Sequence, residues 1–507
     1  MQAESLNDTD WDIVIAGTGL YQSLLALALS RSDKKVLHLD KNSYYGEAEA
    51  AFSLQEAEEW VKEQNNSSAS IENLSPSEED GPKLSFPRAY SLALAPQLIY
   101  TSSKLIECLV TSKAFRQLEF QAMGSWWLYS ASKDSEPDSS GTPAEASGNL
   151  VRIPTNREDV AFSDSTIDLR SKRSVMKVLR FIMDYDNQEE LWEGYKERPF
   201  AEFLTNHFKL PPTLVDLFLA LTFSPTCSSQ TTTAFALPRI SRHLRSIGRL
   251  GPGFSSVIPK WGGLAEVSQV GCRAGAVGGA VYMLGSGISK TESIDDSTTL
   301  HLTSGDIVRT KHLVANPVSL SSNSSQPSQN SSEGTSRSIS IVGSSLPALF
   351  PQLTEGAPIP AGAVVIRPAG SFPSETSDPA PVQLIIHSSE TGECPKNQCI
   401  IYASTPASAP AGPSLLDAAV NALLACIDNP PVLWRMHYPF VPARIPSDAG
   451  DGVHLFPAGM SADLVFDDTI LDRVETIWRA LVGDTNAAFL VFEDREGQAE
   501  DEEDEYL

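Results

Sequence analysis

Two glycines near the start of the chain have the spacing of a phosphate-binding turn. In "DIVIAGTGLYQ", Gly17 and Gly19 follow an apolar run, and Asp40 comes at about the 20-residue distance typical of dinucleotide sites. In such a site the first glycine makes the tight turn, the second lets the backbone approach a pyrophosphate, and the acid binds a ribose. The third glycine, which lets helix and strand pack closely, is replaced by Gln22. The motif is therefore a partial match to a flavin or nicotinamide site.

Other patterns that could do chemistry are weaker. No histidine lies in an HExxH motif, and no Gly-x-Ser-x-Gly nucleophile elbow occurs. His38, between two leucines, is typical of a hydrogen-bonded core imidazole. The closest cysteine pair, "CPKNQC", has no second pair or histidine cluster, so we expect reduced thiols and no metal. Flavoproteins of this architecture usually carry a late Gly-Asp pair, whereas Gly459 precedes Met460. We expect no cofactor and no catalytic residue.

Composition narrows the function classes further. The net charge of −26 over 507 residues argues against nucleic-acid binding and against constitutive binding to anionic lipid. Residues 493–507, "EDREGQAEDEEDEYL", are expected to be a disordered acidic tail. The polar start resembles no signal peptide, and no apolar stretch approaches the ~20 residues of a membrane span. These features predict a soluble cytoplasmic protein.

The elements that must position the glycine turn form an alternating pattern. Residues 12–40 predict strand, helix, strand, and helical spacing dominates 169–192 and the following segments to about 230. Strand-like stretches then return. We therefore expect an α/β fold, a Rossmann-type βαβ domain without cofactor that carries an inserted all-helical domain. The expected boundaries are 1–160 and 231–492 for the discontinuous α/β domain and 161–230 for the helical insert, with disordered loops near 132–149, 319–338 and 403–414.

Several separated blocks resemble the family of Rab GDP-dissociation inhibitors and Rab escort proteins. The opening Gly-Thr-Gly-Leu, "KKVLHLD" and "NSYYG" stand in the family's order, although Glu47 occupies a position where the family usually has a second glycine. Further blocks lie at 87–120, 153–182 and 247–284. The resemblance is faint over 340–450. It implies a flavin-monooxygenase-like fold that does not use FAD, with Gly17 and Gly19 as vestiges of a nucleotide site.

Within this family, the segment "YKERPFAEFLTNHFKLPPTL" is similar to the escort version. The resemblance implies an accessory protein and not an enzyme. Such a protein binds newly made GDP-bound Rab GTPases and presents them to the Rab geranylgeranyl transferase heterodimer. It then shields the geranylgeranyl lipids and delivers Rab during transient membrane contact. The alternatives are a GDP-dissociation inhibitor that recycles prenylated Rabs and, in another class, an FAD-dependent oxidoreductase.

The resemblance also implies site residues. A Rab-binding platform would use Tyr45, Arg88, Glu266 and Arg273, because interfaces are enriched in Tyr and Arg and the guanidinium offers a planar fork of donors. The alternatives are that Tyr45 packs on the turn, that Glu266 and Arg273 form a solvated helix face, and that Arg88 has no role.

Two further sites fall in the helical insert. Phe200 matches an exposed phenylalanine that contacts the transferase, unless it packs in the core with its neighbours. An apolar stripe at i, i+3, i+4 and i+7 would bind the prenyl chain, although core packing is its default explanation. The stripe consists of Val175, Val178, Leu179 and Ile182.

Overall fold

A seven-stranded sheet holds the glycine turn at the carboxyl end of its first strand. Strands β2, β1, β13 and β10 run parallel, and β11 and β12 extend the sheet antiparallel. Its order is β10 (Val281–Leu284), β2 (Val36–Asp40), β1 (Asp10–Ala16), β13 (Ile307–Ala315), β12 (Ser297–Leu302) and β11 (Ile288–Ile294), with β19 (Val453–Leu455) also on β13. The expected βαβ unit is confirmed.

This computed structural model describes most of the chain. The tail beyond 493 and the central parts of the loops expected at 132–149 and 319–338 lie outside the described residues. The described ranges are 6, 9–63, 69–75, 81–131, 148–154, 168–294, 297–320, 334–371, 380–440, 451–457, 463–483 and 486–493.

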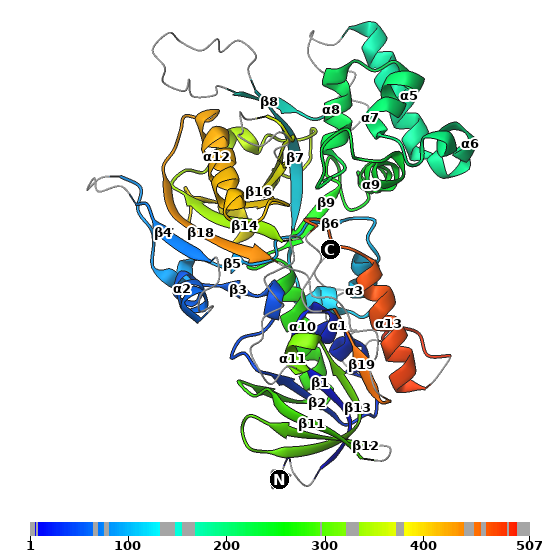
Figure 1. Cartoon of the computed structure of the whole chain (residues 1–507), viewed down its shortest axis with the longest axis vertical. Coiled ribbons are helices and arrows are strands. Elements are labelled where there is room, and N and C mark those ends of the chain that lie inside the picture. Colours follow the sequence, from blue (N-terminus) through cyan, green and yellow to red (C-terminus); the bar gives the residue numbers. More distant parts are fainter. Residues whose placement is uncertain are drawn as a thin grey trace, which may run out of the picture.

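A larger sheet of ten strands occupies the middle of the molecule (Figure 1). Helix α12 (Ala411–Ala425) covers one face, because alternate residues of the strands, such as Val365 and Ile401, point into its core. The order is β4 (Ser70–Asn73), β18 (Val432–Phe440), β14 (Thr335–Val342), β17 (Cys399–Thr405), β16 (Val382–Ser388), β15 (Gly362–Arg367), β7 (Phe120–Ala131), β9 (Ser256–Pro259) and β6 (Ile99–Tyr100), with β8 (Gly148–Arg152) on β7.

Helices complete both ends of the molecule. One face of the parallel strands shares a core with four helices. On the other face, side chains of β1, β2 and β13 form a second core together with side chains of β11 and β12. These helices are α1 (Leu20–Leu29), α3 (Lys104–Thr111), α10 (Leu264–Val277) and α13 (Thr469–Val482). Short strands β3 (Ala51–Phe52) and β5 (Leu92–Ala93) pair beside α2 (Leu54–Glu63). The glycine turn is thus enclosed between sheet and helices.

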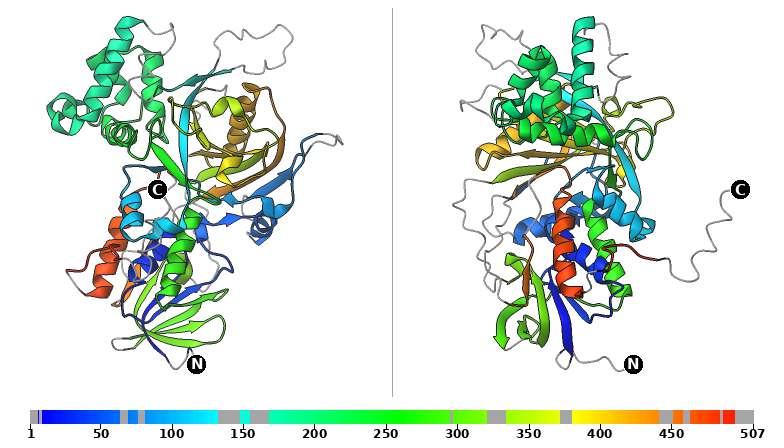
Figure 2. Two further views of the ribbon diagram at one scale, coloured as in Figure 1. Left: turned by 180° about the vertical axis from the view of Figure 1, so that it is seen from behind. Right: turned by 90° about the vertical axis from the view of Figure 1, so that its right-hand side faces the viewer.

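A helical layer lies at the opposite end of the long axis from the parallel sheet (Figure 2). Its apolar side chains belong to one cluster with those on the face of the large sheet opposite to α12. Its members are α5 (Leu169–Met183), α6 (Glu189–Trp192), α7 (Phe200–Phe208), α8 (Pro212–Ala220) and α9 (Thr233–Ser246). Because α9 contacts α5 and α7, the layer continues past the expected boundary at 230.

Two of the expected loops differ from the structure at their ends. Residues 403–405 end strand β17, and 411–414 begin helix α12. Residues 335–338 belong to β14, which pairs with β17 and β18. Serine, alanine and proline made these segments look like loops, but the pairing partners lie far away in the sequence and override the local composition.

Candidate functional site

Two carboxylates of the chain itself fill the glycine turn. Gly17 has a φ of +99°, and a β-carbon there would lie 2.6 Å from Oε1 of Glu47. A β-carbon at Gly19 would lie 2.7 Å from Oε2 of the same side chain. Glu49 accepts a hydrogen bond of 3.1 Å from the backbone amide of Leu20, the first residue of α1. The start of a helix attracts hydrogen-bond acceptors through its free N–H groups and its dipole, and here side-chain carboxyl groups take that position.

Hydrogen bonds hold this arrangement together. Asp40, expected as a ribose-binding acid, accepts from the backbone amide of Thr18 at 2.8 Å and from its hydroxyl at 2.5 Å. The Thr18 hydroxyl in turn accepts from the Gly46 amide at 3.0 Å. The Asn316 side-chain amide donates to Oε2 of Glu47 at 2.9 Å. The Asp40 carboxyl is therefore occupied by hydrogen bonds that hold the loop after β2 against the glycine turn.

The residues present do not fit a dinucleotide pyrophosphate. Burial, followed by the charges of Asp40 and Glu49, raises the pKa of Glu47 to about 8. Burial raises the pKa of Glu49 to about 7, although its bond from Leu20 opposes the shift. A pyrophosphate would have to enter space that these carboxylates hold and add negative charge beside them. Gln22 is buried and donates to the Ala16 carbonyl at 3.4 Å.

Tyr45 lies in the loop between β2 and the turn 47–49, and its side chain is partly buried. Burial, and then the nearby Cys272 and Asp40, raise the pKa of its hydroxyl. Cys272 belongs to α10, so the loop approaches the helix that carries the two other charged candidates. A neutral phenol beside a helix can both pack against a partner and donate a hydrogen bond.

Glu266 and Arg273 lie on one side of α10, seven residues apart. Burial raises the pKa of the half-buried Glu266 carboxyl, while the charge of Arg273 lowers it. Arg273 is exposed, and its Nη1 lies 3.4 Å from Oε1 of Gln117. The structure thus brings Tyr45, Glu266 and Arg273 to α10.

Arg88 stands apart from this group. It lies in a short turn, 87–89, and is exposed. Three residues later the Ser91 hydroxyl donates to the carbonyl of Trp261, which lies three residues before the start of α10. This side-chain-to-backbone hydrogen bond connects the segment after Arg88 to the segment before α10. Among the described residues, no contact joins the Arg88 side chain to the other three candidates.

Trp261 is a surface residue that the sequence analysis missed. Its side chain is 48% exposed, and its φ is +69°, a left-handed conformation that is costly for a bulky residue. Lys260 places its ammonium 4.7 Å from the indole centre, and the Trp261 amide donates to the Thr391 carbonyl at 2.9 Å. The sequence signal that could have pointed to Trp261 is an aromatic residue between a lysine and two glycines, "KWGG".

The expectation that Phe200 is exposed is wrong. Phe200 is 0% exposed and begins α7, where its backbone amide donates to the Thr231 carbonyl at 2.8 Å. Its ring centre lies 6.3 Å from that of Phe203. The apolar side chain points into the helical core because α7 is amphipathic, so the alternative of core packing describes its position.

The apolar stripe on α5 is also buried. All four expected prenyl-contacting residues belong to the core shared with the large sheet. A cavity of about 20 Å³ lies beside two of them, Val175 and Leu179. Four residues of α8 and its end line the same cavity: Leu214, Leu217, Phe218 and Leu221. The contact between α5 and α8 is therefore apolar and nearly closed.

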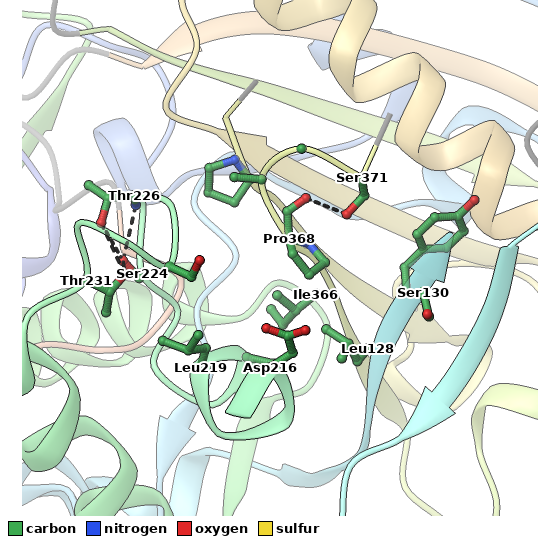
Figure 3. Close-up of a pocket in the computed structure, with 16 residues that line it drawn as sticks. Leu128, Ser130, Asp216, Leu219, Ser224, Thr226, Thr231, Ile366, Pro368 and Ser371 are labelled. Atoms are coloured by element: carbon green, nitrogen blue, oxygen red, sulfur yellow. Dashed lines mark hydrogen bonds between the residues drawn. The ribbon is translucent and has the colours of Figure 1, made fainter. Parts of the chain in front are cut away.

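A larger cavity of about 370 Å³ lies between α8 and the strands β7 and β15 (Figure 3). Its lining is mixed, with the Asp216 carboxyl on one side and hydroxyls of Ser224, Thr226 and Thr231 on another. The three hydroxyls hydrogen-bond to one another at 2.7–3.2 Å. Burial raises the pKa of Asp216. The platform candidates do not line this cavity.

Other chemical groups form no cluster in the described ranges. There, no three His, Cys, Asp or Glu side chains are placed to hold a metal ion. All six cysteines are free. His38 is fully buried with Nε2 2.6 Å from the Gly17 carbonyl, and burial lowers its pKa to about 4. Nor does any helix in the described segments have the length and hydropathy to cross a bilayer.

Known structures share the fold. A Rab GDI from Plasmodium falciparum superposes with a TM-score of 0.63 at 18% identity, covering 94% of this chain and 98% of that one. An oxidoreductase from Methanosarcina mazei gives 0.50 at 12% identity over 92% and 99%. The flavin-monooxygenase-like fold expected from the sequence is confirmed.

Sequence relatives are closer. The "Rab proteins geranylgeranyltransferase component A" of Saccharomyces cerevisiae is 29% identical over 422 residues, which is 81% of this chain and 64% of that protein. The Candida albicans protein of the same name is 28% identical over 78% and 59%. The chain thus spans less than two thirds of the length of these two relatives. A sequence model described as GDI, GDP dissociation inhibitor, matches residues 7–348, and the chain therefore belongs to the GDP dissociation inhibitor family.

Proposed function

We propose that this chain acts as a Rab escort protein, an accessory component of Rab geranylgeranyl transferase. It would bind newly made GDP-bound Rab, present its C-terminal cysteines to the transferase heterodimer, and release the product at a membrane. The observation that carries the proposal is the match to a yeast protein named component A over 81% of this chain. The catalytic residues would then belong to the transferase.

The surface around α10 suits the Rab-binding role. Tyr45 supplies a neutral phenol, Glu266 a half-buried carboxyl, and Arg273 an exposed guanidinium. Exposed Trp261 lies just before the helix and adds apolar area. Aromatic and arginine side chains near the centre of an interface typically contribute most of the binding free energy. Arg88 would contact the partner at the rim, from the neighbouring turn.

The prenyl chain would bind between α5 and α8. A cavity of about 20 Å³ there has room for roughly one water-sized group, so the lipid can enter only if the helices separate. Burying a twenty-carbon chain at ~0.8 kcal/mol per methylene would contribute on the order of 10 kcal/mol, which can offset the loss of the helix contact. The buried stripe Val175, Val178, Leu179 and Ile182 would line the opened groove.

The transferase contact would lie on the exterior of the helical layer. Phe200 is buried, so it would support that contact by positioning the first turn of α7 rather than by touching the transferase. Exposed residues of the same helical layer, such as Leu191 and Arg198, would form the contacting surface.

The second candidate is a GDP-dissociation inhibitor that recycles prenylated Rabs, favoured by the description of the matching family model. In vitro prenylation of an unmodified Rab with purified transferase heterodimer separates the two. An escort protein enables the reaction when this chain is added. If the chain leaves the Rab unmodified but extracts prenylated Rab from membranes, the inhibitor function is correct.

A further inference from the structure

Glu47 stands in a backbone conformation that favours glycine. Its φ is +45°, directly after Gly46 at +99°. A non-glycine residue in the left-handed region costs roughly 1–2 kcal/mol, so the side chain must make contacts that offset this cost. Those contacts are visible: both carboxylate oxygens lie within reach of the Asn316 side-chain amide, at 2.9 and 3.3 Å.

The same carboxylate covers the backbone of the glycine turn. Its two oxygens lie closest to the positions that β-carbons would take at Gly17 and Gly19. Glu49, only 3% exposed, reaches the first amide of α1 from the same short turn. Three carboxyl groups, with Asp40, therefore meet at one helix start, where the charge of Lys41 lowers the pKa of Glu47 and that of Arg337 lowers the pKa of Glu49. Such crowding persists only where donors hold the carboxylates in place.

We propose that Glu47 and Glu49 form an internal carboxyl plug, which occupies the phosphate-binding position of a dinucleotide fold and fastens the loop carrying Tyr45 to the start of α1. The plug makes two structural connections. Glu49 accepts the first N–H of α1, and Glu47 connects the loop after β2 to the segment after β13 through Asn316. The chain therefore keeps the fold without a bound nucleotide.

Removing the plug should leave the start of α1 free to bind an anion. The test uses the full chain as Glu47→Ala/Glu49→Ala, with thermal unfolding followed at increasing inorganic pyrophosphate and matched ionic strength. We expect pyrophosphate at about 10 mM to raise the Tm of this variant by roughly 2 °C or more, because only the folded state offers the helix start. The unmodified chain and the control Glu58→Ala/Glu59→Ala, which removes two exposed charges of α2, should show no rise.

Two results would overturn the proposal. One is a double variant that melts cooperatively with a normal circular dichroism spectrum yet gains nothing from pyrophosphate. The other is an equal rise in the unmodified chain, since a plugged site cannot bind the anion. If the double variant does not fold, Glu47→Ala alone, which keeps the Glu49 bond to Leu20, decides by the same measurement. No Rab is present in this assay, so its outcome is independent of the proposed function.

Discussion

The side-chain amide of Asn316 donates a 2.9 Å hydrogen bond to Glu47, across 269 residues of sequence. Asn316 follows β13 and Glu47 lies in the loop after β2, and both strands run parallel to β1. The carboxyl ends of parallel strands meet at one edge, where open α/β sheets bind their ligands. In this chain that edge is closed by side chains, and the loop that it fixes carries Tyr45.

Glu47 should make stability fall as the pH rises. Its folded pKa of about 8 lies above the ordinary value of 4.5, so between these values the folded state binds more protons than the unfolded state. Stability is therefore greatest below the lower value and is lost as the pH passes the upper one. The pKa of Glu49, at about 7, is raised as well and acts in the same direction.

Thermal unfolding of Glu47→Gln from about pH 5 to 9 should show a shallower fall in Tm than the unmodified chain. Glu58→Gln, on the exposed face of α2, should leave the slope unchanged, and an unchanged slope for Glu47→Gln would contradict the prediction.

The charged pair on α10 should contribute to Rab binding. Replacing Glu266 or Arg273 by alanine should weaken the affinity for a GDP-bound Rab by about 2 kcal/mol, roughly 30-fold, if they lie near the centre of the contact. Isothermal titration or surface plasmon resonance measures the change. Arg249→Ala, an exposed arginine after α9, serves as the charge-matched control. Equal affinities for all three variants would assign the pair to a solvated helix face.

The sequence predicted the fold because its signals are local and ordered. Apolar periodicity and the Gly-Thr-Gly turn specify the βαβ unit, and the spacing of Glu266 and Arg273 places them on one helix side. The burial of Phe200 agrees with the spacing of Phe200, Phe203 and Leu204 on one side of α7, which the resemblance to an exposed phenylalanine had overridden. Glu47 looked like a small departure from a family pattern. Its contacts come from Gly17, Gly19 and Asn316, which only the folded sheet brings together.

Phe200→Ala should destabilise the helical layer. A fully buried phenylalanine loses its contacts and leaves a cavity, which typically costs about 3–5 kcal/mol. Urea unfolding should show a lower midpoint, while Phe86→Ala, at an exposed position, should change it little. Recruitment of the transferase should fall together with stability and recover for Phe200→Leu. Weak recruitment by a Phe200→Ala protein of undiminished stability would instead indicate a direct contact.

Leu179→Phe should separate lipid binding from protein binding. The larger side chain fills the small cavity between α5 and α8 and occupies room that an entering lipid would need. The variant should bind unmodified Rab with unchanged affinity and lose most of the extra affinity for prenylated Rab. Leu169→Phe, on the same helix but 76% exposed, should retain that extra affinity. If both variants bind prenylated Rab like the unmodified chain, the lipid lies elsewhere.

Trp261→Gly should weaken Rab binding without lowering stability. The substitution removes an indole that is 48% exposed. It also places a glycine at a left-handed backbone position, which should stabilise the folded state by roughly 1 kcal/mol. A purely structural tryptophan would show the opposite, a lower Tm and an unchanged affinity. Interface tryptophans often contribute about 2 kcal/mol or more, so at least a tenfold loss of affinity is expected by titration. Trp261→Phe keeps an aromatic ring at the start of α10 and should retain much of the affinity. A Trp261→Gly protein that binds Rab normally would show that the strained tryptophan serves only the packing over Gly392.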